Sequence, residues 1–470
     1  MIASLPIKTN YTLMKKFKYI VIQLLLCCLA FSGCEKYLDV EPKGKQLLKT
    51  TSDFDLWLNS NVLVSETTGD NLMNYMTDNI DMQNVNTPPT TLAELVYTWA
   101  PQFTTDVSTM TYLWGEHYRR ISLFNTVLLG IDAAGGGTAS QKSSLKAEAL
   151  LGRAHSYFYL VNEYAKPYNA ATAATDLAVP YITSDDVSQK TPARSTTAEM
   201  HKHIIDDING AIPSLPEDNS NARFRGSKAA AYSVLARVYL YRREYSEAQR
   251  YAELALANTK AVMIDLTNSA SFPTTTNVVS HPDVIYGRSS LALALPISAE
   301  LKSMFASNDA RRTVLYYNWA SNVRGATLFY AAVVTQAFQL TNSGTTVQEM
   351  HLIAAEGAAR SNNLTIALAH LNEVRRNRYT GTPVASRDFN STIQNEVLDE
   401  VLAERRRELP FHGLRWFDMR RLDTENKMPA VTRTNSQNTV IATLEPHSSK
   451  YTLQIPIQVL AFNPDMIQNP

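Results

Sequence analysis

The sequence predicts an all-α fold with irregular loop insertions and minor β structure. Two observations lead to this prediction. Apolar residues recur at spacings of three and four in several segments, which places one apolar stripe along each predicted helix. Residues 229–257 and 348–377 also carry small residues where two antiparallel helices must approach closely. The chain is therefore expected to form a helical scaffold.

The N-terminal region has the order of an export signal. After Met14, three lysines precede an apolar stretch from Tyr19 to Phe31, and Ser32 and Gly33 stand directly before Cys34. The apolar stretch is shorter than the about 20 residues that span a bilayer. A basic, then apolar, then small-residue order is typical of a cleaved signal peptide.

A cysteine directly after the small residues distinguishes the lipoprotein form of such a signal. We therefore predict a lipoprotein signal peptide over residues 1–33, translation from Met14, and acylation of Cys34. Several acyl chains make membrane attachment durable. An ordinary secretory signal followed by an incidental cysteine is the alternative.

The composition of the rest of the chain suits a globular body outside the bilayer. Residues 1–33 contain four lysines and no acidic residue, while the whole chain has 44 basic and 44 acidic residues, so the mature chain is mildly acidic. Nothing in this balance indicates nucleic acid binding. No cysteine follows Cys34, so the fold is expected to hold without disulfides.

Three helices are predicted in the first half of the chain. Residues 143–164 are apolar on most sides, which predicts a central buried helix. Thr196 and Glu199 form a capping box that opens a helix, and Pro213 ends it. The helix over residues 114–131 has one face formed by Trp114, Tyr118, Ile121, Asn125 and Leu128.

Residues 229–257 and 348–377 resemble the helix-turn-helix unit of tetratricopeptide repeats. Their separation is not a whole number of the roughly 34-residue repeats, so we expect a helical scaffold with insertions and no regular superhelix. The small residues at the pattern positions are Ala236, Ala248, Ala252, Ala255, Ala354, Ala355, Ala358 and Ala367.

The largest expected insertion covers residues 260–346. It is rich in Thr, Asn and Ser and contains strand-like pieces at 278–287 and 327–340. Long irregular segments on a rigid scaffold commonly carry binding surfaces. After the insertion we predict a helix over about 393–409 and a packed, non-helical segment over 453–470.

Nine sequence blocks, in the correct order, resemble the SusD/RagB family of outer-membrane lipoproteins. Several are short and none is decisive alone. The blocks are Cys34 to Pro42, Trp114 to Asn125, Ala147 to Tyr164, Arg194 to Pro216, Lys228 to Tyr241, Glu349 to Arg360, Leu371 to Arg378, Glu404 to Arg420 and Leu453 to Pro470.

This resemblance implies a SusD-like helical scaffold and a function in binding, not catalysis. It implies a cell-surface lipoprotein that captures an oligomeric nutrient, most often a glycan, and delivers it to a SusC-like TonB-dependent transporter. It further implies an N-terminal part over 34–258 with the first helix pair, and a C-terminal part over 259–470 with the insertion and the second pair. The body is expected to face the extracellular side of the outer membrane.

No enzyme motif is found. The chain has no GxSxG elbow, HExxH helix or GxxxxGK loop, and we predict no catalytic residue, metal site or cofactor. His201 and His203 are expected at the surface, pointing apart. Glu404 and Glu408 share a helical face, yet nearby arginines should keep both ionised in a structural charge network with the RWFD turn. Glu356 and Arg360 should form an i,i+4 pair.

Aromatic side chains outside the helical stripes are the candidate ligand residues, because sugar rings pack on flat aromatic faces. Trp99, Tyr317 and Trp319 are predicted to line the binding site, with Tyr286 as a further candidate. Trp57, Trp114 and Trp416 fit helical or core patterns and are expected to pack. Asp70 and Asn71 are weaker candidates for bonding the rim of a ligand.

Two alternatives stay open. The protein could capture oligopeptides in the manner of RagB, where recognition rests on backbone hydrogen bonds and small pockets. It could also be a transporter lid with little ligand affinity of its own.

Overall fold

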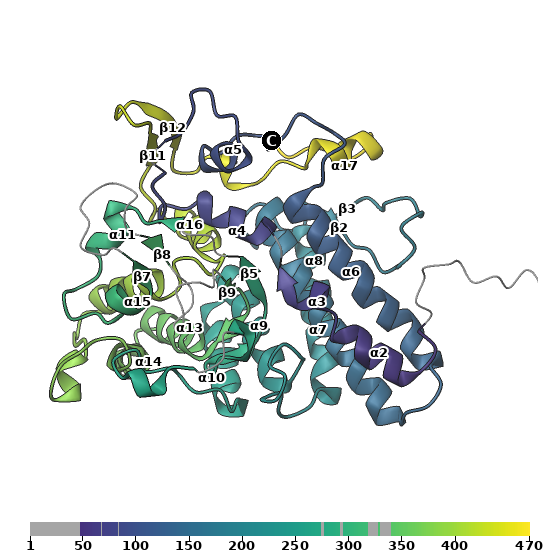
Figure 1. Ribbon diagram of the computed structural model, residues 1–470, viewed down its shortest axis with the longest axis horizontal. Coiled ribbons are helices and arrows are strands. Elements are labelled where there is room, and N and C mark those ends of the chain that lie inside the picture. Colours follow the sequence, from purple (N-terminus) through teal and green to yellow (C-terminus); the bar gives the residue numbers. More distant parts are fainter. Residues whose placement is uncertain are drawn as a thin grey trace, which may run out of the picture. The chain divides into compact units, whose positions relative to one another are not determined.

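The computed structural model describes residues 48–66, 68–82, 84–273, 277–291, 295–317, 328–329 and 340–470. Residues 49–470 form one unit. In Figure 1, α6, α7 and α8 lie on the right and α13, α14 and α15 on the left. The predicted signal over residues 1–33 and the predicted lipid site Cys34 lie outside the described residues.

Helices α6, α7 and α8 pack side by side in the first half of the chain, with α7 in the middle. Most side chains of α7 from Leu145 onward are buried, which confirms the predicted central helix. The helices before α9 are α2 (Thr51–Leu58), α3 (Asn61–Val64), α4 (Thr68–Tyr75), α5 (Leu92–Tyr97), α6 (Tyr112–Gly130), α7 (Ala139–Tyr164) and α8 (Thr197–Ala211).

The capping box that opens α8 is confirmed. Thr196 Oγ1 accepts from the backbone N–H of Glu199 at 3.2 Å, and the Glu199 carboxylate accepts from the backbone N–H of Thr196 at 2.8 Å. Two backbone N–H groups at the start of the helix, which have no partner within the helix, are thereby hydrogen-bonded. The α-helix ends at Ala211, followed by a 3₁₀ turn that contains Pro213.

The two predicted helix pairs are present and lie side by side. They are α9 (Lys228–Tyr241) with α10 (Tyr245–Asn258), and α13 (Val347–Arg360) with α14 (Leu364–Arg376). Helix α10 packs on α13, although the insertion separates them in sequence. At Gly357 a Cβ atom would lie 2.6 Å from the Tyr245 carbonyl oxygen, so this close approach requires glycine.

The described part of the insertion contains short strands and short helices, and the strands confirm the minor β structure. Strand β4 pairs with β10, β5 pairs with β1 and β9, and β8 pairs with β6 and β7. The elements are β4 (Val284–Tyr286), β5 (Ser289–Leu291), β6 (Leu295–Pro296), α11 (Ala299–Ser303), α12 (Arg311–Val314), β7 (Tyr316–Tyr317), β8 (Leu328–Phe329), β9 (Leu340–Asn342) and β10 (Thr345–Thr346), with β1 (Ser65–Glu66) before them.

The expected strand over 278–287 is only partly correct. Residues 278–280 form a 3₁₀ turn and only Val284–Tyr286 form a strand. Strand β4 has a single described partner, β10, which is two residues long and pairs irregularly. Of the expected piece at 327–340, most lies outside the described residues.

The C-terminal segment differs from its prediction at one helix. Residues 453–470 were expected to be non-helical, but Ile457–Phe462 form α17. Pro456 and Pro464 flank this stretch and do not interrupt it, so they permit one helical segment between them. The other C-terminal elements are α15 (Gln394–Glu408), α16 (Arg415–Asp423), β11 (Val431–Thr434) and β12 (Val440–Leu444).

The predicted RWFD turn is the start of α16, a helix that belongs to the buried core. Across the described ranges, no helix combines the length and the apolar character needed to cross a membrane.

Candidate functional site

Trp99 does not lie in an open loop, so the premise behind its prediction as a ligand residue is wrong. The side chain is 4% exposed, and its Nε1–H donates to the Met76 carbonyl at 3.0 Å. The Arg433 guanidinium lies 4.5 Å from the ring centroid. A sugar could stack on Trp99 only if the core opened, and any ligand contact by this residue stays a prediction.

Tyr286 is also buried, with 1% of its surface exposed. The Arg288 guanidinium lies 4.0 Å from its ring centroid, and His155 meets the ring edge-on at 5.6 Å. Its neighbours therefore occupy the surfaces on which a ligand would stack.

The remaining predicted ligand residues cannot be placed by their side chains. Trp319 lies outside the described residues. Tyr317 belongs to β7, and Asp70 and Asn71 belong to α4, but the side chains of these three are not described. Of the predicted set, only Trp99 and Tyr286 have described side chains, and both are buried, so the roles of the whole set stay predictions.

The three tryptophans expected to pack do so. Trp114 is 6% exposed and Trp416 fully buried, while the half-buried Trp57 donates its Nε1–H to the Leu123 carbonyl at 3.0 Å. In contrast, His201 is not a surface residue, because 3% of it is exposed and its ring meets Tyr168 edge-on. Burial lowers the pKa of His201 to about 3, and the nearby Arg242 acts in the same direction.

A groove opens between the loop before β3 and the end of the C-terminal segment. We define the strap groove as the cavity between residues 187–194 and 462–467, with a volume of about 700 Å³. The loop connects β2 (Leu177–Pro180) to β3 (Arg194–Thr196), two strands that pair antiparallel. In Figure 1, α17 lies above α6 and α8.

Exposed apolar side chains border the strap groove. Val187 is 91% exposed, Phe462 84% and Ile467 66%. Large apolar side chains with this exposure, gathered at one cavity, commonly mark a binding surface. Polar side chains line both walls as well: Ser188, Gln189, Lys190, Thr191, Asn463 and Asp465.

Arg194 fixes the two walls relative to each other. Its Nε and Nη2 donate to the Ala178 and Leu177 carbonyls of β2 at 2.7 and 3.1 Å. Its Nη1 and Nη2 also donate to the Ile467 carbonyl and to Asn469 Oδ1, both at 2.7 Å. Burial lowers the pKa of Arg194 to about 10, so the side chain stays cationic at neutral pH and holds the strap against β2.

Local hydrogen bonds shape each wall. In the loop, the Asp186 carboxylate accepts from Ser188 N at 2.9 Å and Ser188 Oγ at 2.7 Å, which forms an Asx turn. In the strap, Asn469 Nδ2 donates to the Tyr164 and Leu453 carbonyls, each at 2.7 Å. The chain end is therefore anchored while Phe462 remains exposed.

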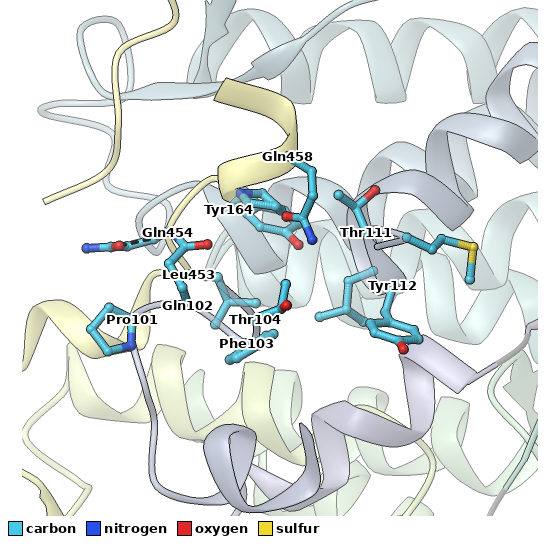
Figure 2. Close-up of a pocket in the computed structure, with 13 residues that line it drawn as sticks. Pro101, Gln102, Phe103, Thr104, Thr111, Tyr112, Tyr164, Leu453, Gln454 and Gln458 are labelled. Carbon is cyan, nitrogen blue, oxygen red and sulfur yellow. Dashed lines mark hydrogen bonds between the residues drawn. The ribbon is translucent and has the colours of Figure 1, made fainter. Parts of the chain in front are cut away.

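A second, smaller cavity borders the start of α17. Figure 2 shows side chains from residues 101–104, from the start of α6 and from 453–458 around one space. Its volume is only about 40 Å³. The Gln102 side chain forms hydrogen bonds with Gln454, Ile455 and Ile457. It therefore joins this loop to the C-terminal segment and is not available to bind an oligomeric ligand.

The charge network around Glu404 is confirmed. Glu404 accepts from Arg311 Nη2 and Arg407 Nη2, both at 2.7 Å, and from the Tyr379 hydroxyl at 3.0 Å. Burial would raise the pKa of Glu404, but Arg311, Arg407 and Arg375 outweigh burial and hold that pKa well below its usual range. A carboxylate held ionised in this way serves as a structural counter-charge.

Glu408, on the same helical face, also pairs with arginines. Glu408 accepts from Arg378 Nη2 at 2.7 Å and from Arg311 Nη1 at 2.8 Å. Arg405 pairs with Asp418 of α16 at 3.0 Å, and Glu356 pairs with Arg360 at 2.9 Å as predicted. In the part of the chain that the structure describes, no group of three or more His, Cys, Asp or Glu side chains could hold a metal ion.

Sequence reasoning missed Phe462, Val187 and Arg194 as residues of the groove. The signal for Phe462 was an apolar residue directly before Asn463 and Pro464 at the end of a short apolar segment. Neither wall by itself indicates a groove, because the cavity exists only where the two meet.

Two family models match the chain in succession. The first, described as starch-binding and associating with the outer membrane, matches residues 36–240, and the second, described as the SusD family, matches residues 348–470. No curated protein sequence matches the chain.

Solved structures share the fold. A SusD superfamily protein from Bacteroides thetaiotaomicron has a TM-score of 0.71 and 20% identity, over 90% of this chain and 100% of that one. A SusD-like carbohydrate binding protein from Bacteroides vulgatus has 0.67 and 18%, over 89% and 97%. Surface glycan-binding protein A from Bacteroides uniformis has 0.68 and 17%, over 89% and 99%.

Proposed function

Because the chain belongs to the SusD/RagB family, we propose that it is a surface lipoprotein that binds an oligosaccharide in the strap groove. The family model that matches residues 36–240 is described as starch-binding and as associating with the outer membrane. Two of the solved structures with this fold are described as carbohydrate- or glycan-binding. Both observations support a glycan ligand.

The exposed Phe462 at the groove carries the proposal. A sugar ring presents C–H groups on its face and hydroxyl groups at its rim, so it needs a flat apolar surface beside hydrogen-bonding groups. Phe462 is 84% exposed and supplies such a surface. Gln189, Lys190 and Asp465 line the same groove and can bond the rim hydroxyls.

The size of the groove fits an oligomer. Ligand sites for small molecules commonly have volumes of about 300–1,000 Å³, and the strap groove has about 700 Å³. An oligosaccharide longer than the cavity would extend beyond it. Repeating hydroxyl and C–H patterns would then be read by the two walls together.

Membrane attachment and delivery complete the proposal. Acylation of Cys34 would tether the body to the outer membrane, and a SusC-like TonB-dependent transporter would receive the glycan. The order of basic, apolar and small residues before Cys34 supports the anchor, and the family match supports the partner.

Calorimetric titration tests the proposal. The chain from Glu35 onward is titrated with soluble plant, host and microbial glycans and with mixed oligopeptides. We expect saturable binding of at least one glycan, and at least a tenfold weaker Kd in Phe462→Ala, equivalent to about 1.4 kcal/mol. Leu129→Ala is the matched control, because Leu129 is a 60% exposed apolar residue of α6 that does not line the groove.

Each other outcome has a defined meaning. Binding of peptides alone would move the protein to the RagB-like alternative. Absence of binding across the panel would favour a lid that depends on its transporter. Glycan binding that Phe462→Ala leaves unchanged would keep the ligand class and refute the strap groove.

A further inference from the structure

A small, partly open cavity lies at the base of the insertion, away from the strap groove. We define the base cavity as the space of about 70 Å³ lined by residues that include Asp283, Asn342, Gln348 and His412. These residues come from the start of β4, the end of β9, the first turn of α13 and the α15–α16 connection. The cavity therefore lies where the insertion meets the scaffold.

Two amide side chains at this cavity each have one polar atom that has no hydrogen-bond partner among the residues that the structure describes. Asn342 is 6% exposed and Gln348 5%. Asn342 Oδ1 accepts from the backbone N–H groups of Arg288 and Gly344 at 2.9 and 3.1 Å. Its Nδ2 has no hydrogen-bond partner among the described residues.

Gln348 shows the complementary arrangement. Its Nε2 donates to Asp283 Oδ2 at 2.8 Å, and its Oε1 has no partner within the described ranges. These partners fix the orientation of both amides. A flip of Asn342 would point its NH₂ group at backbone N–H groups, and a flip of Gln348 would point its oxygen at the Asp283 carboxylate. Both residues line the base cavity, so one buried donor and one buried acceptor belong to its lining residues. Buried polar groups left in this state are costly and rare.

The charged groups at the cavity compensate one another. Arg378 donates to Glu408 at 2.7 Å and to the Ile264 carbonyl at 2.6 Å, and Glu408 also accepts from Arg311. His412 Nδ1 contacts the Asn342 carbonyl oxygen at 2.7 Å, so this nitrogen donates. Burial lowers the pKa of His412, which favours the neutral ring at neutral pH.

A hydroxyl group matches this lining, since one oxygen can accept from Asn342 Nδ2 and donate to Gln348 Oε1. A bare cation could not accept from the amide donor, and an anion could not donate to the amide acceptor. The volume also fits: one water needs about 10–15 Å³ of such space, so the cavity holds a few oxygen positions or a short polyol.

We propose that the base cavity is a binding site for hydroxyl-bearing small molecules, either water or a short polyol, with Asn342 as donor and Gln348 as acceptor. The occupant links β9 of the insertion to the first turn of α13. The proposal is independent of the function of the strap groove.

Crystals of the chain from Glu35 onward test the site, grown once without polyol and once with glycerol. We expect an oxygen within hydrogen-bond distance of Asn342 Nδ2 and Gln348 Oε1 in both. Water in both crystals would identify water as the source, and glycerol replacing water in the second would identify a polyol. An empty cavity, or a metal ion or halide in it, would overturn the proposal.

A filling variant tests the same site in solution. Val278 lines the cavity and is 3% exposed, so Val278→Ile adds one methylene group at its wall. If hydroxyl groups occupy the cavity, the variant displaces them, leaves the amide atoms unpaired and lowers Tm by a few degrees. If the cavity is dry, the added group fills a void and Tm rises, which would contradict the proposal.

Discussion

Charged side chains usually lie on the surface of a protein and apolar side chains inside it. Two regions of this molecule show the opposite: the buried charge network around Arg311, and the strap groove. Arg311 is fully buried between Asp309, Glu404 and Glu408, whereas Phe462 and Val187 are almost fully exposed. Charges are placed inside where they hold α12 against α15, and apolar side chains outside where a ligand can reach them. Substitutions in the network should therefore change stability, and substitutions in the groove should change affinity.

The largest loss of stability is expected for Arg311→Met. The variant would leave three buried carboxylates without their shared counter-charge, and breaking a buried pair in this way costs about 3–5 kcal/mol. Urea unfolding measures the loss. Arg250→Met is the control, because the half-exposed Arg250–Glu247 pair should contribute at most about 1 kcal/mol. Equal effects of the two variants would contradict the structural role of the network.

Trp99→Ala is expected to lower stability, as Arg311→Met does, and to leave ligand affinity unchanged. Removing this buried ring leaves a cavity beneath Arg433, and such truncations cost about 3–5 kcal/mol. Under conditions where the variant is folded, its glycan affinity should match that of the wild type. A stable variant with lost affinity would return Trp99 to the ligand site.

Acid should weaken the scaffold before it alters the groove. His351 Nδ1 lies 2.9 Å from His370 Nδ1 between α13 and α14. Burial, and then the facing His370, lowers the pKa of His351 to about 4, and burial also lowers the pKa of His370. The unfolded chain thus binds more protons, so stability is complete above about pH 6.5 and falls toward pH 4, by roughly 3 kcal/mol.

Urea midpoints across this pH range measure the effect. His351→Asn should make the decline between pH 6.5 and 4 shallower, because it removes the proton uptake of His351, while the buried His370 and His201 remain. A decline as steep as that of the wild type would show that other groups control it.

A smaller effect on stability is expected at the turns within the two helix pairs. Arg243 and Asn362 occupy the same left-handed position, with φ of 62° and 59°. Asn tolerates this conformation, whereas other side chains with a Cβ pay about 1–2 kcal/mol. Asn362→Ala should therefore lower stability by about 1 kcal/mol, and Asn362→Gly should not. Urea unfolding of both variants distinguishes this backbone effect from loss of a side-chain contact.

The first pair adopts the same turn with a residue less suited to it. Arg243 Nη2 donates to the Tyr168 carbonyl at 2.9 Å, a contact with the loop after α7. A tertiary contact thus stabilises the left-handed conformation at Arg243, whereas at Asn362 the residue's own preference stabilises it. This explains why both helix pairs could be predicted from spacing although their turns differ in sequence.

The smallest effect on stability is expected for Phe462→Ala. The side chain is almost fully exposed, so unfolding should change by less than about 0.5 kcal/mol. Its glycan affinity should still fall at least tenfold. A large loss of stability would mean that Phe462 packs against the body in solution.

Helical periodicity predicted α6, α7, α8 and both helix pairs because it reports which face of a segment is apolar. It does not report what covers an aromatic ring. Trp99 follows a short helix, yet Arg433, far along the chain, covers it. Phe462 resembles a packed residue in sequence, but the fold leaves it beside the loop 187–194. The candidate site therefore required the tertiary arrangement, whereas the scaffold required only local patterns.

The proposed delivery step depends on the groove being the glycan site, so the most direct test is a crystal structure of the chain from Glu35 onward with the tightest-binding oligosaccharide. We predict a sugar ring stacked on Phe462, with its hydroxyl groups bonded to side chains of residues 187–194. An oligosaccharide bound elsewhere, with the strap groove empty, would contradict the account.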